Sequence, residues 1–138
     1  MDSLRFTVLT NPVAKARART CIKNGYVHSY TPKATADAES EIQQVLYEQC
    51  LVHAGQCYFG KGTALKVRID FYIAPPKSKN KKRIYPVTRP DLDNYIKTVL
   101  DALNNRVYAD DSQIVELHTT KAYGNPPRID IEIEEVQP

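Results

Sequence analysis

Several features typical of secreted and membrane proteins are missing from this sequence. No apolar run approaches the roughly 18 residues that a membrane-spanning helix needs. The residues after Met1 do not form a basic segment followed by an apolar one, so no secretory signal is predicted. Cysteine is scarce, with three residues and no Cys-x-x-Cys pair, which fits reduced thiols better than a disulfide framework. We therefore expect a cytoplasmic protein with no membrane partner.

Internal repeats are also absent, and the 138 residues are about the length of one domain. Apolar and polar alternation predicts strands over 4–9, 64–74, 113–121 and 128–134, and a short hairpin around Asn24-Gly25. Apolar spacings of three and four residues predict helices over 31–53 and 91–103. We expect the last two strands to pair as a hairpin around 124–127. The pattern predicts a single α+β domain over residues 1–138, with two main helices packed on a mixed sheet.

The small net charge of +3 conceals an uneven distribution of charge along the chain. Residues 1–90 carry 15 Lys and Arg against 6 Asp and Glu, whereas residues 91–138 carry 4 against 10. A single charge run is most often only a solvated face. Separate basic and acidic parts are, however, what a metal-dependent enzyme acting on a polyanion needs, because one part binds phosphates and the other binds the cation.

Four of the five aspartates within residues 91–111 fall in two pairs, one at the start of a predicted helix and one before a predicted strand. They are Asp91, Asp93, Asp110 and Asp111. Such clusters suit Mg²⁺ or Mn²⁺, which complete their coordination with water and substrate phosphate. Helix capping is the alternative, and it would explain one or two of the four. A calcium-binding EF-hand is excluded, because Ile96 and Ala102 stand where its glycine and closing glutamate would fall.

The helix predicted over 91–103 has an apolar face suited to a core and a polar face with a distinctive row. Asp93, Lys97 and Asp101 follow one another at intervals of four residues, so they lie on one line of the helix. Capping does not explain a lysine one turn beyond the aspartates. The row of Asp93, Lys97 and Asp101 therefore favours a metal-dependent functional site over aspartates that only cap a helix.

Cations are concentrated in an early stretch and in a predicted loop over residues 75–90. Lys15, Arg17 and Arg19 alternate, which places all three on one side of an extended segment, whereas in a helix they would fan apart. The loop is too basic to pack into a core, and a plain solvated loop is the alternative to a DNA-binding one. The predicted DNA-binding residues are Lys15, Arg17, Arg19, Lys77, Lys79, Lys81, Lys82, Arg83 and Arg89.

Several motifs of this chain occur together in one protein family. The specific ones are Asp91-Leu92-Asp93-Asn94-x-x-Lys97, Leu100-Asp101-Ala102-Leu103-Asn104 and Asp110-Asp111-Ser112-Gln113-Ile114-Val115. Others are Pro12-Val13-Ala14-Lys15-x-Arg17-x-Arg19, Tyr30-Thr31-Pro32 and Pro76-Lys77-Ser78. In combination they closely resemble the RusA family of Holliday junction resolvases, over about residues 8–134.

The resemblance implies a RusA-like fold and a homodimer, often phage-encoded, that nicks four-way DNA junctions symmetrically in recombination and repair. It implies Mg²⁺, or Mn²⁺ as a substitute, as the cofactor, branched DNA as the partner, and no organic cofactor. It also implies that Asp91, Asp93, Lys97 and Asp111 are catalytic. Asp91, Asp93 and Asp111 would hold the metal, with Asp110 as a further candidate, and Lys97 would offset charge in the transition state. One metal and two metals both stay open.

Two other functions remain as alternatives. A metal-dependent nuclease for other branched or flapped DNA would use the same chemistry, because carboxylates determine the reaction and not the shape of the substrate. A non-catalytic DNA-binding module would explain the basic part of the chain alone. The aspartates argue against such a module, because carboxylates beside DNA repel its phosphates unless a cation lies between them.

Overall fold

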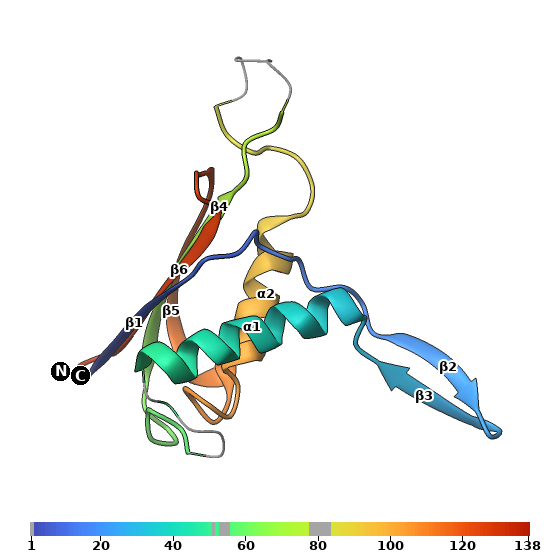
Figure 1. Ribbon diagram of the computed structural model, residues 1–138. Helices are drawn as coiled ribbons and strands as arrows, with labels where there is room; N and C mark the ends of the chain where they lie inside the picture. Colours follow the sequence, from blue (N-terminus) through green and yellow to red (C-terminus); the bar gives the residue numbers. More distant parts are fainter. Residues whose placement is uncertain (1, 51, 53–55, 78–83) are drawn as a thin grey trace.

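A computed structural model describes residues 2–50, 52, 56–77 and 84–138 of the chain. Its elements are β1 (Ser3–Val8), β2 (Arg19–Lys23), β3 (Tyr26–Tyr30), α1 (Lys33–Cys50), β4 (Leu65–Ile73), α2 (Leu92–Leu103), the short 3₁₀ helix η1 (Asp111–Gln113), β5 (Ile114–Tyr123) and β6 (Arg128–Glu135) (Figure 1). All predicted strands and helices are present, with ends shifted by a few residues. No helix within the described residues is long and apolar enough to cross a membrane.

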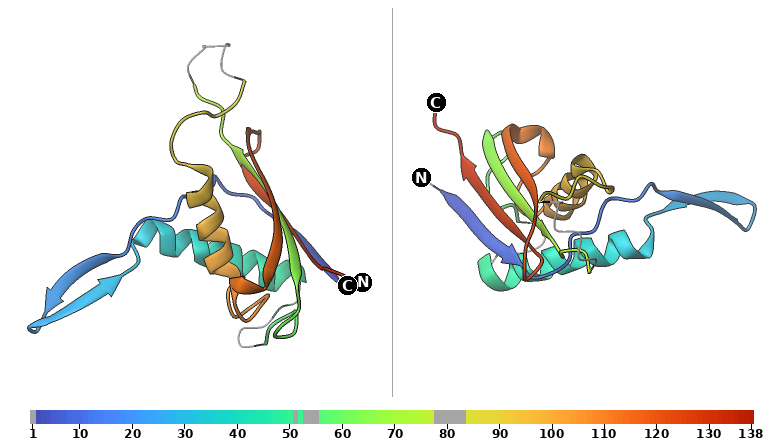
Figure 2. Two further views of the ribbon diagram at one scale, coloured as in Figure 1. Left: turned by 180° about the vertical axis from the view of Figure 1, so that it is seen from behind. Right: turned by 90° about the horizontal axis from the view of Figure 1, so that it is seen from above.

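Four strands form one mixed sheet in the order β1-β6-β4-β5, and β2 and β3 form a separate two-stranded sheet. β6 is antiparallel to both β1 and β4, whereas β5 is parallel to β4. Both helices lie on the same face of the four-stranded sheet, which is clearest in the view from above (Figure 2). The architecture is therefore α+β, with two helices packed on a mixed sheet as predicted.

The central strand β4 seats the second helix through its apolar face. Alternate side chains of β4 are almost completely buried, from Leu65 to Phe71, because successive residues of a strand point to opposite faces. The Phe71 ring lies 5.4 Å from the ring of Tyr95, which α2 presents to the sheet. Val99 and Leu103 continue the same buried stripe of α2 at intervals of four residues. This packing fixes the helix that carries the predicted catalytic row.

The prediction that the last two strands pair as a hairpin is wrong. β4 lies between them, parallel to β5 and antiparallel to β6. The physical reason is burial: β4 has the most continuous apolar face and occupies the centre, while most residues of β5 up to Thr120 are exposed and suit an edge. A four-residue connection reaches up to about 13 Å, enough to cross the roughly 9.5 Å between two strands that flank a third.

The connection between β5 and β6 crosses the end of β4 in close contact with it. The N–H of Gly124 donates a hydrogen bond to the carbonyl oxygen of Ile73, the last residue of β4. A Cβ atom at Gly124 would lie 2.6 Å from the Cβ of Tyr72, closer than real Cβ contacts allow. Glycine is therefore required here by the close approach of two backbones.

Candidate functional site

The first aspartate of the predicted site occupies the N-cap of α2 without acting as a cap. Asp91 has an extended backbone, with φ −70° and ψ 151°, and its side chain makes no capping hydrogen bond. Asp93 follows in the first helical turn and is exposed. Capping therefore does not account for Asp91, and both carboxylates stand at the positive end of the helix dipole.

Two lysines from distant parts of the chain, Lys15 and Lys121, hold the start of α2, and neither was predicted to contact it. Lys121 of β5 donates hydrogen bonds from Nζ to the carbonyl oxygens of Thr88 (3.0 Å) and Pro90 (3.1 Å). The backbone N–H of Lys15 donates to the carbonyl oxygen of Asn94 (2.9 Å). The segment that presents the two aspartates is thus fixed by two distant parts of the chain, and no local sequence signal could have revealed this.

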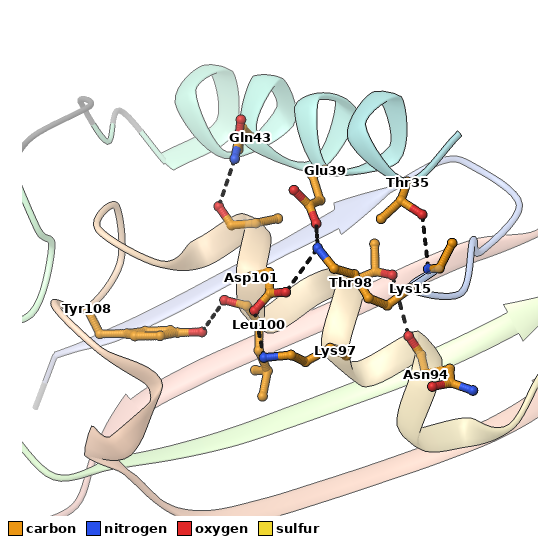
Figure 3. A network of polar contacts seen from close by, with 12 residues as sticks. Lys15, Thr35, Glu39, Gln43, Asn94, Lys97, Thr98, Leu100, Asp101 and Tyr108 are labelled. Atoms are coloured by element: carbon orange, nitrogen blue, oxygen red, sulfur yellow. Dashed lines mark hydrogen bonds and ion pairs between the residues drawn. The ribbon is translucent and has the colours of Figure 1, made fainter. Parts of the chain in front are cut away.

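The predicted catalytic lysine belongs to a chain of ion pairs that runs from α2 to α1. Lys97 Nζ lies 3.0 Å from Asp101 Oδ1, as the spacing of four residues predicts. The other oxygen of Asp101 lies 3.1 Å from Lys15 Nζ, which also lies 2.6 Å from Glu39 of α1. Figure 3 shows Lys15 between Glu39 and Asp101, and Lys97 on the side of Asp101 away from α1. Asp101 therefore holds the ammonium group of Lys97 on one side.

Lys15 does not lie on one exposed side with Arg17 and Arg19 as expected. Its side chain is 23% exposed and turns in between Glu39 and Asp101, while Arg17 and Arg19 are exposed. Burial alone would lower the pKa of Lys15, but hydrogen bonds and charge attraction from the two carboxylates outweigh it and raise the pKa. The difference from the prediction arises because α1 and α2 each present a carboxylate to the same point.

We expect Lys15→Met to lower the free energy of unfolding by about 1–3 kcal/mol, because two carboxylates lose the cation between them. Since its pKa is raised on folding, the contribution of Lys15 is fully present at neutral pH and is lost as the pH rises through the folded-state pKa. Urea unfolding at pH 7 measures the loss. Arg17→Met, in the same segment but exposed, is the matched control, and equal stability of the two variants would contradict the bridge.

The second acidic pair divides into a capping residue and a residue available for another role. Asp110 caps η1: its carboxylate accepts from the N–H of Ser112 (3.1 Å), and the side chain of Gln113 accepts from the Asp110 N–H in return. Gln113 also donates to the carbonyl oxygens of Gly60 and Thr63, which anchors this turn beside β4. Among the described residues, Asp111 has no such capping bond, so it is the member of the pair whose carboxylate stays available.

A buried tyrosine places the second acidic pair beside α2. The Tyr108 hydroxyl donates to the carbonyl oxygen of Leu100 (2.7 Å). Burial raises the pKa of Tyr108 far above its usual range, and the negative charges of Asp111, Asp101 and Asp110 add to this shift. The hydroxyl therefore stays protonated and keeps its hydrogen bond to α2. Tyr108 was not predicted as a site residue, because nothing in the sequence distinguishes it from the other eight tyrosines except its place two residues before Asp110.

The positive charge of Lys97 also affects the pKa of Asp110, one residue of the same acidic pair. Hydrogen bonding by Ser112 lowers the pKa of Asp110, and the positive charge of Lys97 adds to this effect. The ion pair that Lys97 makes is with Asp101. Within the described residues, however, no three acidic, histidine or cysteine side chains are gathered closely enough to enclose a metal ion.

The predicted DNA-binding residues fall into three groups. Lys15 is engaged between the two helices, whereas Arg17, Arg19, Lys77 and Arg89 are exposed. The remaining four, Lys79, Lys81, Lys82 and Arg83, lie outside the described residues. Arg17 lies just before β2 and Arg19 is its first residue. Lys77 and Arg89 lie in the connection between β4 and α2.

Comparison with known proteins agrees with these observations. Residues 10–134 match the family model described as endodeoxyribonuclease RusA. The chain is 36% identical over 146 residues to the uncharacterized protein YqaN of Bacillus subtilis (strain 168), with 99% of each chain covered. It is 43% identical over 81 residues to the crossover junction endodeoxyribonuclease rusA of Lactococcus phage r1t, covering 56% of this chain and 60% of the relative. The chain belongs to the RusA family of endodeoxyribonucleases.

Proposed function

We propose that this protein resolves four-way DNA junctions by paired symmetric nicks, as a Mg²⁺-dependent homodimer acting in recombination and repair. The observation that carries the proposal is the row of Asp93, Lys97 and Asp101 on α2, in which the Lys97 ammonium lies 3.0 Å from Asp101, in a chain of this family. A row of carboxylates with one adjacent lysine provides both negative ligands and a counter-charge for phosphate.

The donor set fits a hard divalent cation. Asp91, Asp93 and Asp111 offer carboxylate oxygens, and Asp91 and Asp111 are not consumed by capping within the described residues. Mg²⁺ takes few protein carboxylates and completes its shell with water and phosphate, so an open arrangement of oxygens suits it. When bound, such a cation would polarise the scissile phosphate and make a water molecule more acidic.

The chain's own residues would orient the substrate around this site. The Lys97 ammonium, restrained by Asp101, would offset negative charge that develops on the phosphate or on the leaving oxygen. Asp110 would shape the turn that presents Asp111, because its carboxylate is bonded to Ser112. Arg17, Arg19, Lys77 and Arg89 would bind the DNA backbone, together with Lys79, Lys81, Lys82 and Arg83. Two-fold symmetry of a dimer would place one site on each of two opposed strands.

The test is a comparison of substrates with the purified protein. A synthetic four-way junction, a flap and a linear duplex are each incubated with Mg²⁺ and with a chelator. We expect symmetric nicks in the junction only, and only with the cation. Equal cleavage of the flap would favour a broader branched-DNA nuclease, equal cleavage of linear duplex would contradict junction specificity, and cleavage in the chelator would contradict metal dependence.

A further inference from the structure

The β2–β3 hairpin stands apart from the rest of the molecule. It extends away from the sheet and the two helices in every view (Figures 1 and 2). Every residue of β3 is exposed, and four large side chains of the hairpin are exposed to an unusual degree: Ile22 by 77%, Val27 by 73%, Tyr26 by 71% and Tyr30 by 48%. An isolated two-stranded hairpin is only marginally stable in water, so such a surface is suited to a partner.

The strand register divides these side chains between two faces. Residues directly opposite each other in an antiparallel pair share a face. One face therefore carries the pairs Arg19 with Tyr30, Cys21 with His28, and Lys23 with Tyr26. The other carries Thr20 with Ser29 and Ile22 with Val27. A hollow lined by Cys21, Lys23, His28 and Tyr30 lies on the first face, which we call the tyrosine face.

The charge around the hairpin indicates the kind of partner. From Ser3 to Ala36 the chain contains no aspartate or glutamate. The same stretch carries six cations, among them Arg19 and Lys23, which flank the two exposed tyrosines of the tyrosine face. Cations interleaved with aromatic rings complement a strand that has phosphates along its backbone and flat bases beside them.

We propose that the tyrosine face binds unpaired or unstacked bases at the centre of a DNA branch. Tyr26 and Tyr30 stack on bases, while Arg19 and Lys23 pair with the adjacent phosphates. Stacking requires an open face of a base, which a branch point offers and an intact duplex does not. The proposal rests on the proposed function, and it assigns to the hairpin the recognition of branch shape that the catalytic carboxylates cannot provide.

The first test is the double variant Tyr26→Ala/Tyr30→Ala, measured by binding without divalent cation so that cleavage does not intervene. We expect its affinity for a four-way junction to fall about 10- to 100-fold, with little change for linear duplex. The matched control is Ile22→Ala/Val27→Ala on the opposite face, which should bind the junction like the unaltered protein. An equal loss in both variants, or an equal loss for duplex and junction, would overturn the proposal.

A second readout uses the native thiol of the tyrosine face. In the unaltered protein, junction DNA should slow maleimide labelling of Cys21 several-fold, with peptide mapping separating it from Cys50 and Cys57. In Thr20→Cys/Cys21→Ser, the thiol lies on the opposite face and labelling should not change. Protection of both thiols, or of neither, would overturn the proposal.

Failure of this proposal can be told apart from failure of the proposed function. Normal junction cleavage by Tyr26→Ala/Tyr30→Ala, with normal binding, would leave the nuclease intact and remove the hairpin's role. A protein that protects Cys21 with junction DNA but never cleaves it would support the hairpin and contradict the nuclease. Loss of the dimer in Tyr26→Ala/Tyr30→Ala, seen by sedimentation without DNA, would assign the tyrosine face to a second copy of this chain and overturn the proposal.

Discussion

Replacing Asp93 with asparagine is expected to slow junction cleavage at least about 100-fold while junction binding survives. Asp93 lies in the first turn of α2, in the row that leads to Lys97. Asparagine keeps the size of the side chain and its place on the helix but removes the charge that a divalent cation requires. Single-turnover cleavage of a labelled junction measures the rate, and a gel-shift assay without divalent cation measures binding.

The matched control for this variant is Asp37→Asn, which removes an exposed aspartate from α1. It changes the net charge of the protein by the same amount, so any general effect of charge on DNA affinity appears in both variants. We expect cleavage by Asp37→Asn to stay within a factor of about two of the unaltered protein. Undiminished cleavage by Asp93→Asn would remove this residue from the site.

Phe71→Ala is expected to have the largest effect on stability, a loss of about 3–5 kcal/mol in the free energy of unfolding. The Phe71 side chain is 1% exposed and packs against Tyr95, so alanine leaves a cavity between β4 and the helix that carries the site. Urea denaturation measures the loss, with Phe71→Leu expected to lose less because leucine refills part of the space.

The control for the core substitution is Val115→Ala, on the edge strand β5. Val115 is 65% exposed, so its truncation should change stability by less than about 0.5 kcal/mol. A loss below about 1 kcal/mol in Phe71→Ala would show that the interface between β4 and α2 relaxes around the missing ring. Because this interface seats α2, we also expect Phe71→Ala to reduce cleavage at temperatures where the protein is still folded.

The elements of this fold were predictable because each has a strong local pattern. The alternating face of β4 and the apolar stripe of α2 are properties of neighbouring residues, and both are buried as expected. The pairing of β5 with β4 instead of β6 was not predictable in this way. Alternation indicates that a strand has a buried face, but it carries no information about which strand lies beside it.

The same distinction applies to the site. The row of Asp93, Lys97 and Asp101 follows from helical spacing, and the structure has the ion pair that this spacing predicts. The inward turn of Lys15 depends on Glu39 and Asp101, which are distant in sequence and meet only after α1 and α2 pack. Lys15 was predicted to be exposed from its charge and from its alternate spacing with Arg17 and Arg19, and neither property reveals the two carboxylates that partly bury it.

The order of strands in the sheet bears on how the chain is made. β6 lies between β1 and β4, so β1 has no neighbour in this sheet until β6, the last of its four strands along the chain, has been synthesised. Pairings between such remote segments form late and together, since each must first close a long loop. A nascent chain would therefore carry the aspartates of α2 well before the sheet beneath them is complete. We therefore expect nuclease activity to appear only once β6 has been synthesised and the sheet beneath α2 is complete.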